Sequence, residues 1–398
     1  MWDVVVVGAG PAGASTAYFL AQAGVSVLLL DRQAFPRDKV CGDGVSAKGL
    51  AVLEQMGLAE WINRHGFVEP HTLLLSGPDG SSVTMDYTHA PFCYGRVIPR
   101  QMLDSALVNQ AVSAGAHLVE NCHVHSCEHI DGRGIRVSGT QAGQSSSYEA
   151  RLLVVAEGSK AALSKQLGLT HVEPDLAAIR GYFAERSGLN DRLEIHYDKA
   201  ISPGYSWIFP LGNGMVNVGL GTFLQQLGRR RLDLASELER VIVGNPYFQQ
   251  RLNAISGRPS VKGFTLRTDL SKSRLYADHV LVVGEAAHLV NPLTGEGIAP
   301  ALLSGQTAAE HMRRALERGN FSAAALAPYG YDIRSRYALD HRAALWLRRL
   351  LSCPGMVNRI IRNARGDKEL ALALGLVIIG VTSPTTLLKP SMLVRYLL

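Results

Sequence analysis

The sequence predicts an α/β protein with a dinucleotide-binding domain, a second domain built on an antiparallel sheet, and a helical C-terminal region. Two stretches predict the first domain. Residues 3–31 follow the order strand, glycine turn, helix, strand and acidic residue, and residues 279–316 again follow the order strand, glycine-rich turn and helix. A series of short strands between about residues 175 and 265 predicts the antiparallel sheet.

The first thirty residues carry the clearest pattern. Residues 4–7 are four valines, as is typical of a parallel strand buried on both faces. After them Gly8 permits a sharp turn, Gly10 lets a pyrophosphate approach the backbone, and Gly13 lets a helix pack closely on the sheet. The start of that helix offers free N–H groups to phosphates. Asp31, 18 residues after Gly13, can accept hydrogen bonds from a ribose, so we expect a Rossmann-like unit.

The composition is that of a globular protein long enough for two domains, with 398 residues, 47% hydrophobic and 19% charged. The net charge of +6 is compatible with anionic lipid, a phosphorylated substrate or a merely solvated surface. The sequence contains no nucleic-acid-binding module, so we expect no nucleic-acid partner. The oligomeric state is left open.

Five cysteines, an odd and sparse set, favour a reducing compartment over a disulfide framework. The N-terminus begins directly with a strand and shows no signal-peptide pattern. The longest apolar run, residues 370–381, is too short to span a bilayer. We therefore expect a cytoplasmic protein and leave peripheral contact with a membrane open.

Residues 32–46 form a loop that leads away from the nucleotide toward a helix beginning after Ser46. Cys41 in this loop is a candidate for chemistry, and a small buried thiol is the alternative. Cysteine and histidine also gather at residues 122–127. Strict strand alternation would place Cys122 and Cys127 on opposite faces, so we expect an ordinary strand there and no metal site.

The strand at residues 205–210 carries three aromatic residues. Alternation places Tyr205, Trp207 and Phe209 on one face, which predicts either a large apolar surface for a ligand or ordinary core packing. Farther along, the turn at residues 295–297 precedes a helix from Ile298, a second helix start that can stabilise negative charge on a ligand. Glu285 can hydrogen-bond a polyol. No second Rossmann unit for a nicotinamide is visible.

Three stretches together resemble the FAD motifs of the para-hydroxybenzoate-hydroxylase-like flavoproteins: the N-terminal unit, residues 156–158, and residues 284–297. Within that superfamily the chain is similar to the geranylgeranyl reductase family, through KVCGDGVS at 39–46, YSWIFP at 205–210 and NPLTGEGI at 291–298. The resemblance implies a discontinuous FAD-binding domain (1–70, 97–174 and 266–330), a substrate-binding domain (71–96 and 175–265) and a C-terminal helical region (331–398) of unassigned role.

The resemblance also implies residue roles. Cys41 would be catalytic, standing near the flavin and the reacting double bond, and Tyr205, Trp207 and Phe209 would line a tunnel for an isoprenoid chain. Non-covalent FAD would be held by Gly8, Gly10, Ala12, Gly13, Asp31, Arg32, Gly42, Arg100, Glu157, Gly158, Glu285, Pro292, Gly295, Gly297 and Ile298. At two of these positions the family commonly has Asp, where this chain has Glu157 and Glu285.

The implied reaction is reduction of C=C bonds in a prenyl lipid by hydride from reduced flavin, with NAD(P)H or another external donor reducing the flavin. Two alternatives stay open. A flavin monooxygenase or halogenase would use the same fold with oxygen, and the sequence EAAH at 285–288 and Trp207 are compatible with that chemistry. A prenyl-binding escort protein without cofactor would not need the intact glycine turn, Asp31 or the 295–297 loop.

Overall fold

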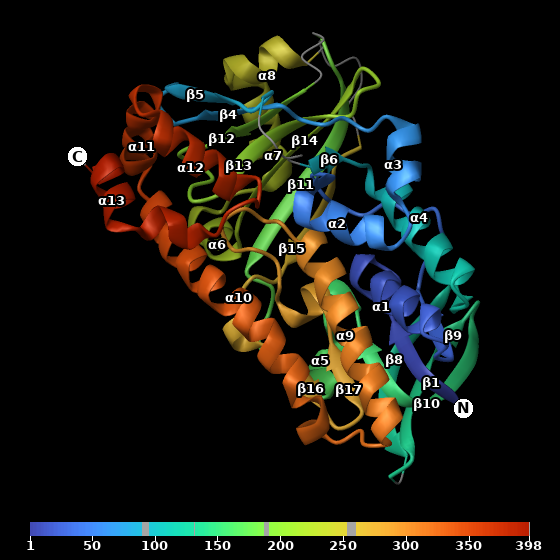
Figure 1. Cartoon of the computed structure of the whole chain (residues 1–398). Coiled ribbons are helices and arrows are strands. Elements are labelled where there is room, and N and C mark those ends of the chain that lie inside the picture. The colour runs from blue at the N-terminus through green and yellow to red at the C-terminus, as the bar shows by residue number, and fades with distance from the viewer. Residues whose placement is uncertain (90–94, 131, 187–190, 253–259, 398) are drawn as a thin grey trace.

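A computed structural model describes residues 1–89, 95–130, 132–186, 191–252 and 260–397. Two large sheets lie in opposite halves of an elongated molecule, and the C-terminal helices run along one side of both (Figure 1). The predicted architecture is therefore confirmed: an α/β domain, a mainly antiparallel second sheet and a helical C-terminal region.

The first sheet has eight strands and a parallel centre in the order β17-β10-β1-β2-β7, and β16, β8 and β9 add antiparallel edges. Residues 4–6 in its centre are completely buried, which explains the valine run. Its strands are β1 (Trp2–Val7), β2 (Val27–Leu30), β7 (His117–Val119), β8 (Cys122–Ile130), β9 (Gly134–Gln141), β10 (Gln144–Val155), β16 (Tyr276–Ala277) and β17 (Val280–Val282).

Helices α1 (Pro11–Gln22) and α9 (Ile298–Arg318) follow β1 and β17 and pack tightly against each other. The close approach needs small residues, since a Cβ on Gly305 would lie 2.3 Å from the carbonyl oxygen of Ala12. The surrounding helical elements are α2 (Ala47–Gln55), α3 (Ala59–His65), α4 (Arg100–Ser113), η1 (Gly158–Lys160), α5 (Ala162–Gln166), η2 (Leu270–Lys272) and η3 (Gly284–Ala287).

The second sheet has seven strands in the order β15-β11-β14-β13-β12-β4-β5, all antiparallel except for the pair β12–β4. Its strands are β4 (Thr72–Ser76), β5 (Ser82–Asp86), β11 (Leu176–Ala184), β12 (Arg192–His196), β13 (Tyr205–Pro210), β14 (Met215–Phe223) and β15 (Lys262–Leu266). The short pair β3 (Gly44–Ser46) and β6 (Gly95–Val97) lies apart from both sheets. Helices α6 (Leu224–Arg230), α7 (Leu234–Gly244) and α8 (Pro246–Arg251) follow β14.

The C-terminal region packs against the second sheet. Apolar residues of β4, β5 and β12 share a core with Val357, Leu370, Leu374 and Val377. The region comprises α10 (Ala323–Leu351), α11 (Pro354–Gly366), α12 (Lys368–Ile378), η4 (Pro384–Leu388) and α13 (Pro390–Leu397). Within the described ranges, no helix is long and apolar enough to cross a membrane.

The prediction that Cys122 and Cys127 point to opposite faces of their strand is wrong. A register shift between Val124 and Ser126 adds a residue to β8, so that both cysteines are buried while His123 and His125 are exposed. Cys93 lies outside the described residues.

Candidate active site

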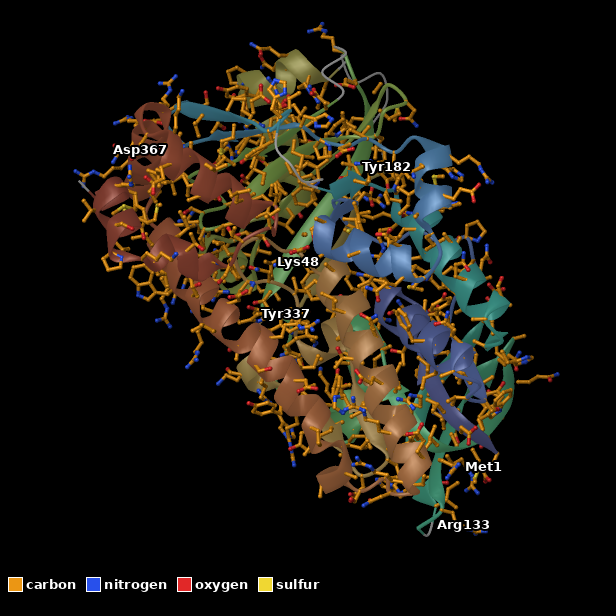
Figure 2. All side chains as sticks on the ribbon, viewed as in Figure 1. Met1, Lys48, Arg133, Tyr182, Tyr337 and Asp367 are labelled. Carbon is orange, nitrogen blue, oxygen red and sulfur yellow. The ribbon has the colours of Figure 1, made fainter. Side chains whose placement is uncertain are left out.

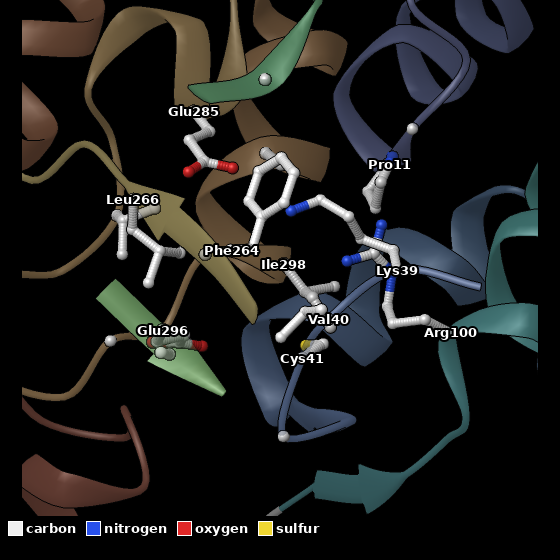
Figure 3. Close-up of a pocket in the computed structure, with 18 of the residues that line it drawn as sticks. Pro11, Lys39, Val40, Cys41, Arg100, Phe264, Leu266, Glu285, Glu296 and Ile298 are labelled. Carbon is white, nitrogen blue, oxygen red and sulfur yellow. The ribbon is translucent and has the colours of Figure 1, made fainter. Parts of the chain in front are cut away.

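A cavity of about 390 Å³ lies between the two sheets, beyond the ends of β1 and β2 where their chains leave the first sheet. In α/β sheets this edge is the usual place for a ligand. Segments distant in sequence line it, among them the turn after β1, the loop at 37–46 and residues 285–298 (Figure 3). Strand β13 and residues Arg100, Glu157 and Phe264 contribute further parts of the wall. Every residue predicted for the site lines this cavity except Gly13.

The glycine turn has the geometry that its sequence predicts. Gly8 has a φ of +102°, and a Cβ there would lie 2.3 Å from the carbonyl oxygen of Ala156, so only glycine fits. A Cβ on Gly13 would lie 1.8 Å from the Gly8 oxygen, so Gly13 serves the packing of α1 and makes no contact with the cavity. Asp31 accepts hydrogen bonds from the N–H groups of Ala9 (2.8 Å) and Gln33 (2.9 Å), which fixes its carboxylate beside the turn.

Two arginines share one buried carboxylate at the cavity wall. Arg100 donates two hydrogen bonds of 2.7 Å to Asp104, and Arg37 lies 2.9 Å from the same carboxylate. Burial alone would lower the pKa of Arg100, but the Asp104 carboxylate raises it above its ordinary value. Arg37 also lies 3.9 Å from Asp31, and its buried Nε atom has no hydrogen-bond partner within the described residues, so this wall can still donate to an anionic group.

Glu157 and Glu285 differ in their partners. Glu157 accepts a 3.1 Å hydrogen bond from the N–H of Ser164 at the start of α5. The Oε1 atom of Glu285 is buried and has no hydrogen-bond partner within the described part of the chain. Burial raises the pKa of both carboxyl groups. The hydroxyl groups of an FAD ribityl chain would supply the donors that Glu285 lacks, so the residues present fit this cofactor.

Lys39 also extends into the cavity, with its amine directed at the ring of Phe264 (Figure 3). The Lys39 Nζ atom lies 3.2 Å from the ring centroid. Burial lowers the pKa of Lys39 to about 8, and the charge of Glu285 opposes this shift.

Cys41 lines the same cavity. Burial raises the pKa of its thiol above the ordinary value, and the positive charge of Arg100 offsets only part of the rise. The thiol is therefore neutral near pH 7 and holds a proton that it can donate.

The aromatic residues of β13 form one wall, as their alternation predicts. The ring centroids of Tyr205 and Trp207 are 6.1 Å apart, and those of Trp207 and Phe209 are 6.3 Å apart. The Tyr205 hydroxyl donates to the carbonyl oxygen of Thr294. This bond ties the wall to the turn before α9.

A second cavity of about 50 Å³ adjoins the first and is almost wholly apolar. The two cavities share Ile195, Tyr205, Leu293, Thr294 and Ile378 in their walls. Its remaining walls come largely from the C-terminal helices, through Leu347, Leu350, Leu351, Val357, Ile360, Ile361, Leu374, Val377, Leu387 and Tyr396. The region to which the sequence assigned no role therefore closes the apolar end of the site.

Comparison with known proteins identifies the family of this chain. Residues 1–183 match the FAD binding domain, and residues 178–250 match the geranylgeranyl reductase catalytic domain. Menaquinone reductase of Mycobacterium tuberculosis is 36% identical over 317 residues, which cover 77% of this chain and 76% of that protein. Digeranylgeranylglycerophospholipid reductase 1 of Methanopyrus kandleri is 34% identical over 345 residues, covering 82% of this chain and 84% of that protein. The chain belongs to the geranylgeranyl reductase family.

Solved structures share the fold. A geranylgeranyl bacteriochlorophyll reductase-like protein of Thermoplasma acidophilum superposes with a TM-score of 0.82 at 21% identity, over 98% of both chains. The flavin-dependent halogenase CmlS superposes with a TM-score of 0.73 at 22% identity, over 86% of this chain and 63% of that one. The chain is thus an FAD-dependent oxidoreductase of the geranylgeranyl reductase type.

Several side chains at this reductase site escaped the sequence analysis. Asp104 is one of them, and its position four residues after the predicted Arg100 in one helix could have indicated their pairing. Lys39 stands in a stretch already noted, but nothing local shows that it faces the cavity. Asp43 and Asn217 lie 174 residues apart, and their 2.7 Å hydrogen bond leaves no pattern in the sequence.

Proposed function

We propose that this reductase saturates C=C bonds in the prenyl chain of a lipid. The observation that carries the proposal is the continuity of the aromatic wall of β13 with the apolar second cavity. An extended hydrocarbon chain fits this arrangement, since burying each CH₂ group contributes about 0.8 kcal/mol. A small polar metabolite would gain nothing from the second cavity.

Reduction of an alkene adds a hydride to one carbon and a proton to the other. Reduced FAD, when bound, supplies the hydride. We assign the proton to the Cys41 thiol, which its raised pKa keeps protonated at neutral pH. The charge of Arg100 would stabilise the thiolate left behind until solvent returns a proton. An isolated alkene accepts hydride poorly, so the aromatic wall must hold it within reach of both donors.

We also propose which residues contact each part of the FAD molecule. The ADP half of FAD would lie against the glycine turn and Asp31, with Arg32 at the rim and Arg100 near the phosphates or the ribityl chain. Glu285 would bind the ribityl hydroxyls, and residues 295–297 would meet the pyrimidine edge. The other predicted contacts are Gly42, Glu157, Gly158, Pro292 and Ile298.

The names of the two related proteins indicate lipid substrates with different head groups. One head group is a quinone and the other is a glycerophosphate. Menaquinones and digeranylgeranyl lipids share a prenyl chain, and the apolar second cavity suits that common part. We therefore propose a prenyl lipid as the substrate class. NAD(P)H or another external donor would reduce the FAD.

We further propose that the outer face of α10 contacts the membrane that holds this lipid. Tyr331, Leu339 and Trp346 are 74%, 59% and 46% exposed. Their spacing places them on one side of the helix with the exposed Arg342 and Arg349, over about 27 Å. Side chains project outward along this helix in Figure 2. Apolar and cationic side chains on one face suit an anionic lipid surface.

Sedimentation with vesicles tests this contact. The protein should bind phosphatidylglycerol vesicles more strongly than phosphatidylcholine vesicles, and salt should weaken binding. Leu339→Glu with Trp346→Glu should abolish binding, whereas Val112→Glu, at an exposed apolar position on α4, should leave it unchanged. Equal binding of both variants would overturn the assignment to α10.

Anaerobic turnover tests the reaction itself. The reduced holoenzyme would be incubated with a geranylgeranyl lipid and with a menaquinone, and products would be read by mass. Gains of two hydrogens that persist after exposure to air support chain saturation. A gain that air reverses indicates reduction of the quinone ring, and a product that forms only with oxygen indicates the monooxygenase or halogenase chemistry. Either of these two results would overturn the proposal, as would no product from any prenyl lipid.

A further inference from the structure

Asp43 lies two residues after Cys41 and has an unusual backbone conformation. Its φ is +64°, in the left-handed region, and its side chain is completely buried. A conformation of this kind persists only where the surroundings enforce it. The enforcing contacts come from elements on both sides of the cavity.

Three donors converge on the Asp43 carboxylate. The hydroxyl of Tyr182 on β11 donates at 2.8 Å, the amide of Asn217 on β14 at 2.7 Å, and the backbone N–H of Arg100 at 3.2 Å. The Asp43 carbonyl oxygen also accepts from the N–H of Ile98. The carboxylate thus joins the second sheet to the start of α4.

The Asn217 side chain, which is completely buried, extends this connection to Cys41 and to the substrate wall. Its amide nitrogen donates to the carbonyl oxygen of Cys41 at 2.7 Å, and its amide oxygen accepts from the indole nitrogen of Trp207 at 2.9 Å. Both hydrogens and the oxygen of the amide are therefore used. One side chain sets the distance between the Cys41 backbone and the wall of β13.

Packing reinforces the same arrangement. A Cβ on Gly42 would lie 3.1 Å from the ring of Phe209 and 3.5 Å from the Trp207 indole nitrogen. The backbone between Cys41 and Asp43 therefore rests directly on the aromatic wall. Any rotation of Trp207 that broke its bond to Asn217 would also disturb this loop.

We infer that Asn217 and Asp43 are positioning residues, which hold the Cys41 thiol at a fixed place relative to the substrate wall. The inference rests on the proposed role of Cys41 as proton donor. Neither side chain needs to touch the substrate. Their effect is on where the proton is delivered, and a misplacement near 1 Å can cost about a hundredfold in rate.

The chain supplies a matched control in Asp38, which anchors the same loop. Asp38 pairs with Arg180 and with Lys262, the latter at 2.8 Å. No hydrogen bond links its side chain to Cys41 or to Trp207 within the described residues. Loss of Asp38 loosens the loop without breaking the connection between the thiol and the wall.

The test compares Asn217→Leu, Tyr182→Phe and Asp38→Asn with the unaltered holoenzyme. One readout is the rate of Cys41 alkylation by iodoacetamide against pH, followed by mass spectrometry of the Cys41 peptide. The other is kcat and KM for a geranylgeranyl lipid. Asn217→Leu should shift the alkylation profile and lower kcat by about a hundredfold with KM changed less than threefold. Tyr182→Phe should show a smaller change in the same direction, and Asp38→Asn should stay within twofold.

An alkylation profile in Asn217→Leu and Tyr182→Phe that matches the unaltered protein would overturn the inference. So would an equal effect of Asp38→Asn, which would indicate general loosening of the loop. If Asn217→Leu fails to fold, Tyr182→Phe, which loses one hydroxyl, decides alone. Alkylation needs no turnover, so a protein inactive on every prenyl lipid would refute the proposed function and still report on the positions of Cys41 and its neighbours.

Discussion

Cys41 combines two properties that a proton donor needs. Burial raises the pKa of its thiol, so that the thiol is protonated, and the positive charge of Arg100 would stabilise the thiolate formed when the proton leaves. Replacing Cys41 by alanine should lower the anaerobic rate of prenyl reduction by about 10² to 10⁴, the usual worth of a general acid. Retention of FAD should be unchanged, as read from flavin absorbance of the purified protein.

Cys353 provides the control for that replacement, because it is exposed and far along the chain. Cys353→Ala should leave the rate unchanged. A Cys41→Ala protein that retains the full rate would assign the proton to another group. A monooxygenase would also tolerate this replacement better than a reductase.

The buried carboxyl group of Asp43 should make the stability of the protein depend on pH. Burial raises its pKa from 3.8 to about 6. The folded state therefore binds more protons than the unfolded state between these values, and stability from this group falls as pH rises from about 4 to 6. The fall amounts to about 3 kcal/mol for Asp43 alone.

Urea unfolding of the unaltered protein and of Asp43→Asn, at several pH values, measures the contribution of Asp43 to the free energy of unfolding. The difference between the two free energies of unfolding should slope between pH 4 and 6 and be flat above. A difference that is constant across this range would contradict the assignment.

At the scale of elements, the contact between α1 and α9 depends on the absence of a side chain at Gly305. Gly305→Ala places a Cβ 2.3 Å from the carbonyl oxygen of Ala12, so the two helices must separate. We expect a loss of about 1 to 3 kcal/mol in stability, together with weaker FAD binding, because both helices begin at the cavity.

Thermal unfolding and FAD titration measure the two effects. Gly228→Ala in α6 is the matched control, since a Cβ there meets nothing within 4 Å. It should be neutral or slightly stabilising. Equal behaviour of the two variants would show that the helices tolerate a wider spacing.

Elements set by local pattern were predictable, and those set by distant contacts were not. The turn from Gly8 to Gly13 and the aromatic alternation of Tyr205 to Phe209 depend on neighbours in sequence. The extra residue in β8 does not, because its cause lies in the pairing with β9, and strict alternation therefore misplaced Cys127. The role of Asn217 likewise depends on Cys41, 176 residues away.

At the scale of the whole molecule, the C-terminal helices bound the second cavity, which we propose receives the end of the substrate chain. Val377 on α12 lines the second cavity. Val377→Phe should fill most of it and raise KM several-fold for a geranylgeranyl chain, with little effect on a shorter geranyl chain. Leu372→Phe is the control, because Leu372 on the same helix is 48% exposed.

KM values for a series of chain lengths measure this prediction. If Val377→Phe affects short and long chains alike, the second cavity does not receive the end of the substrate. FAD content and thermal unfolding of both variants separate this effect from damage to the fold.

The composite cavity has a consequence for biosynthesis. Its walls include Gly8 and also Ile378 and Ile379, so segments that are synthesised far apart in time meet in one site. The turn after β1 is synthesised early, whereas the aromatic strand, residues 205–210, stays uncovered until α11 and α12 are made. The nascent protein therefore exposes an apolar surface from the synthesis of β13 to that of α12, and aggregation through this surface is the hazard of that interval.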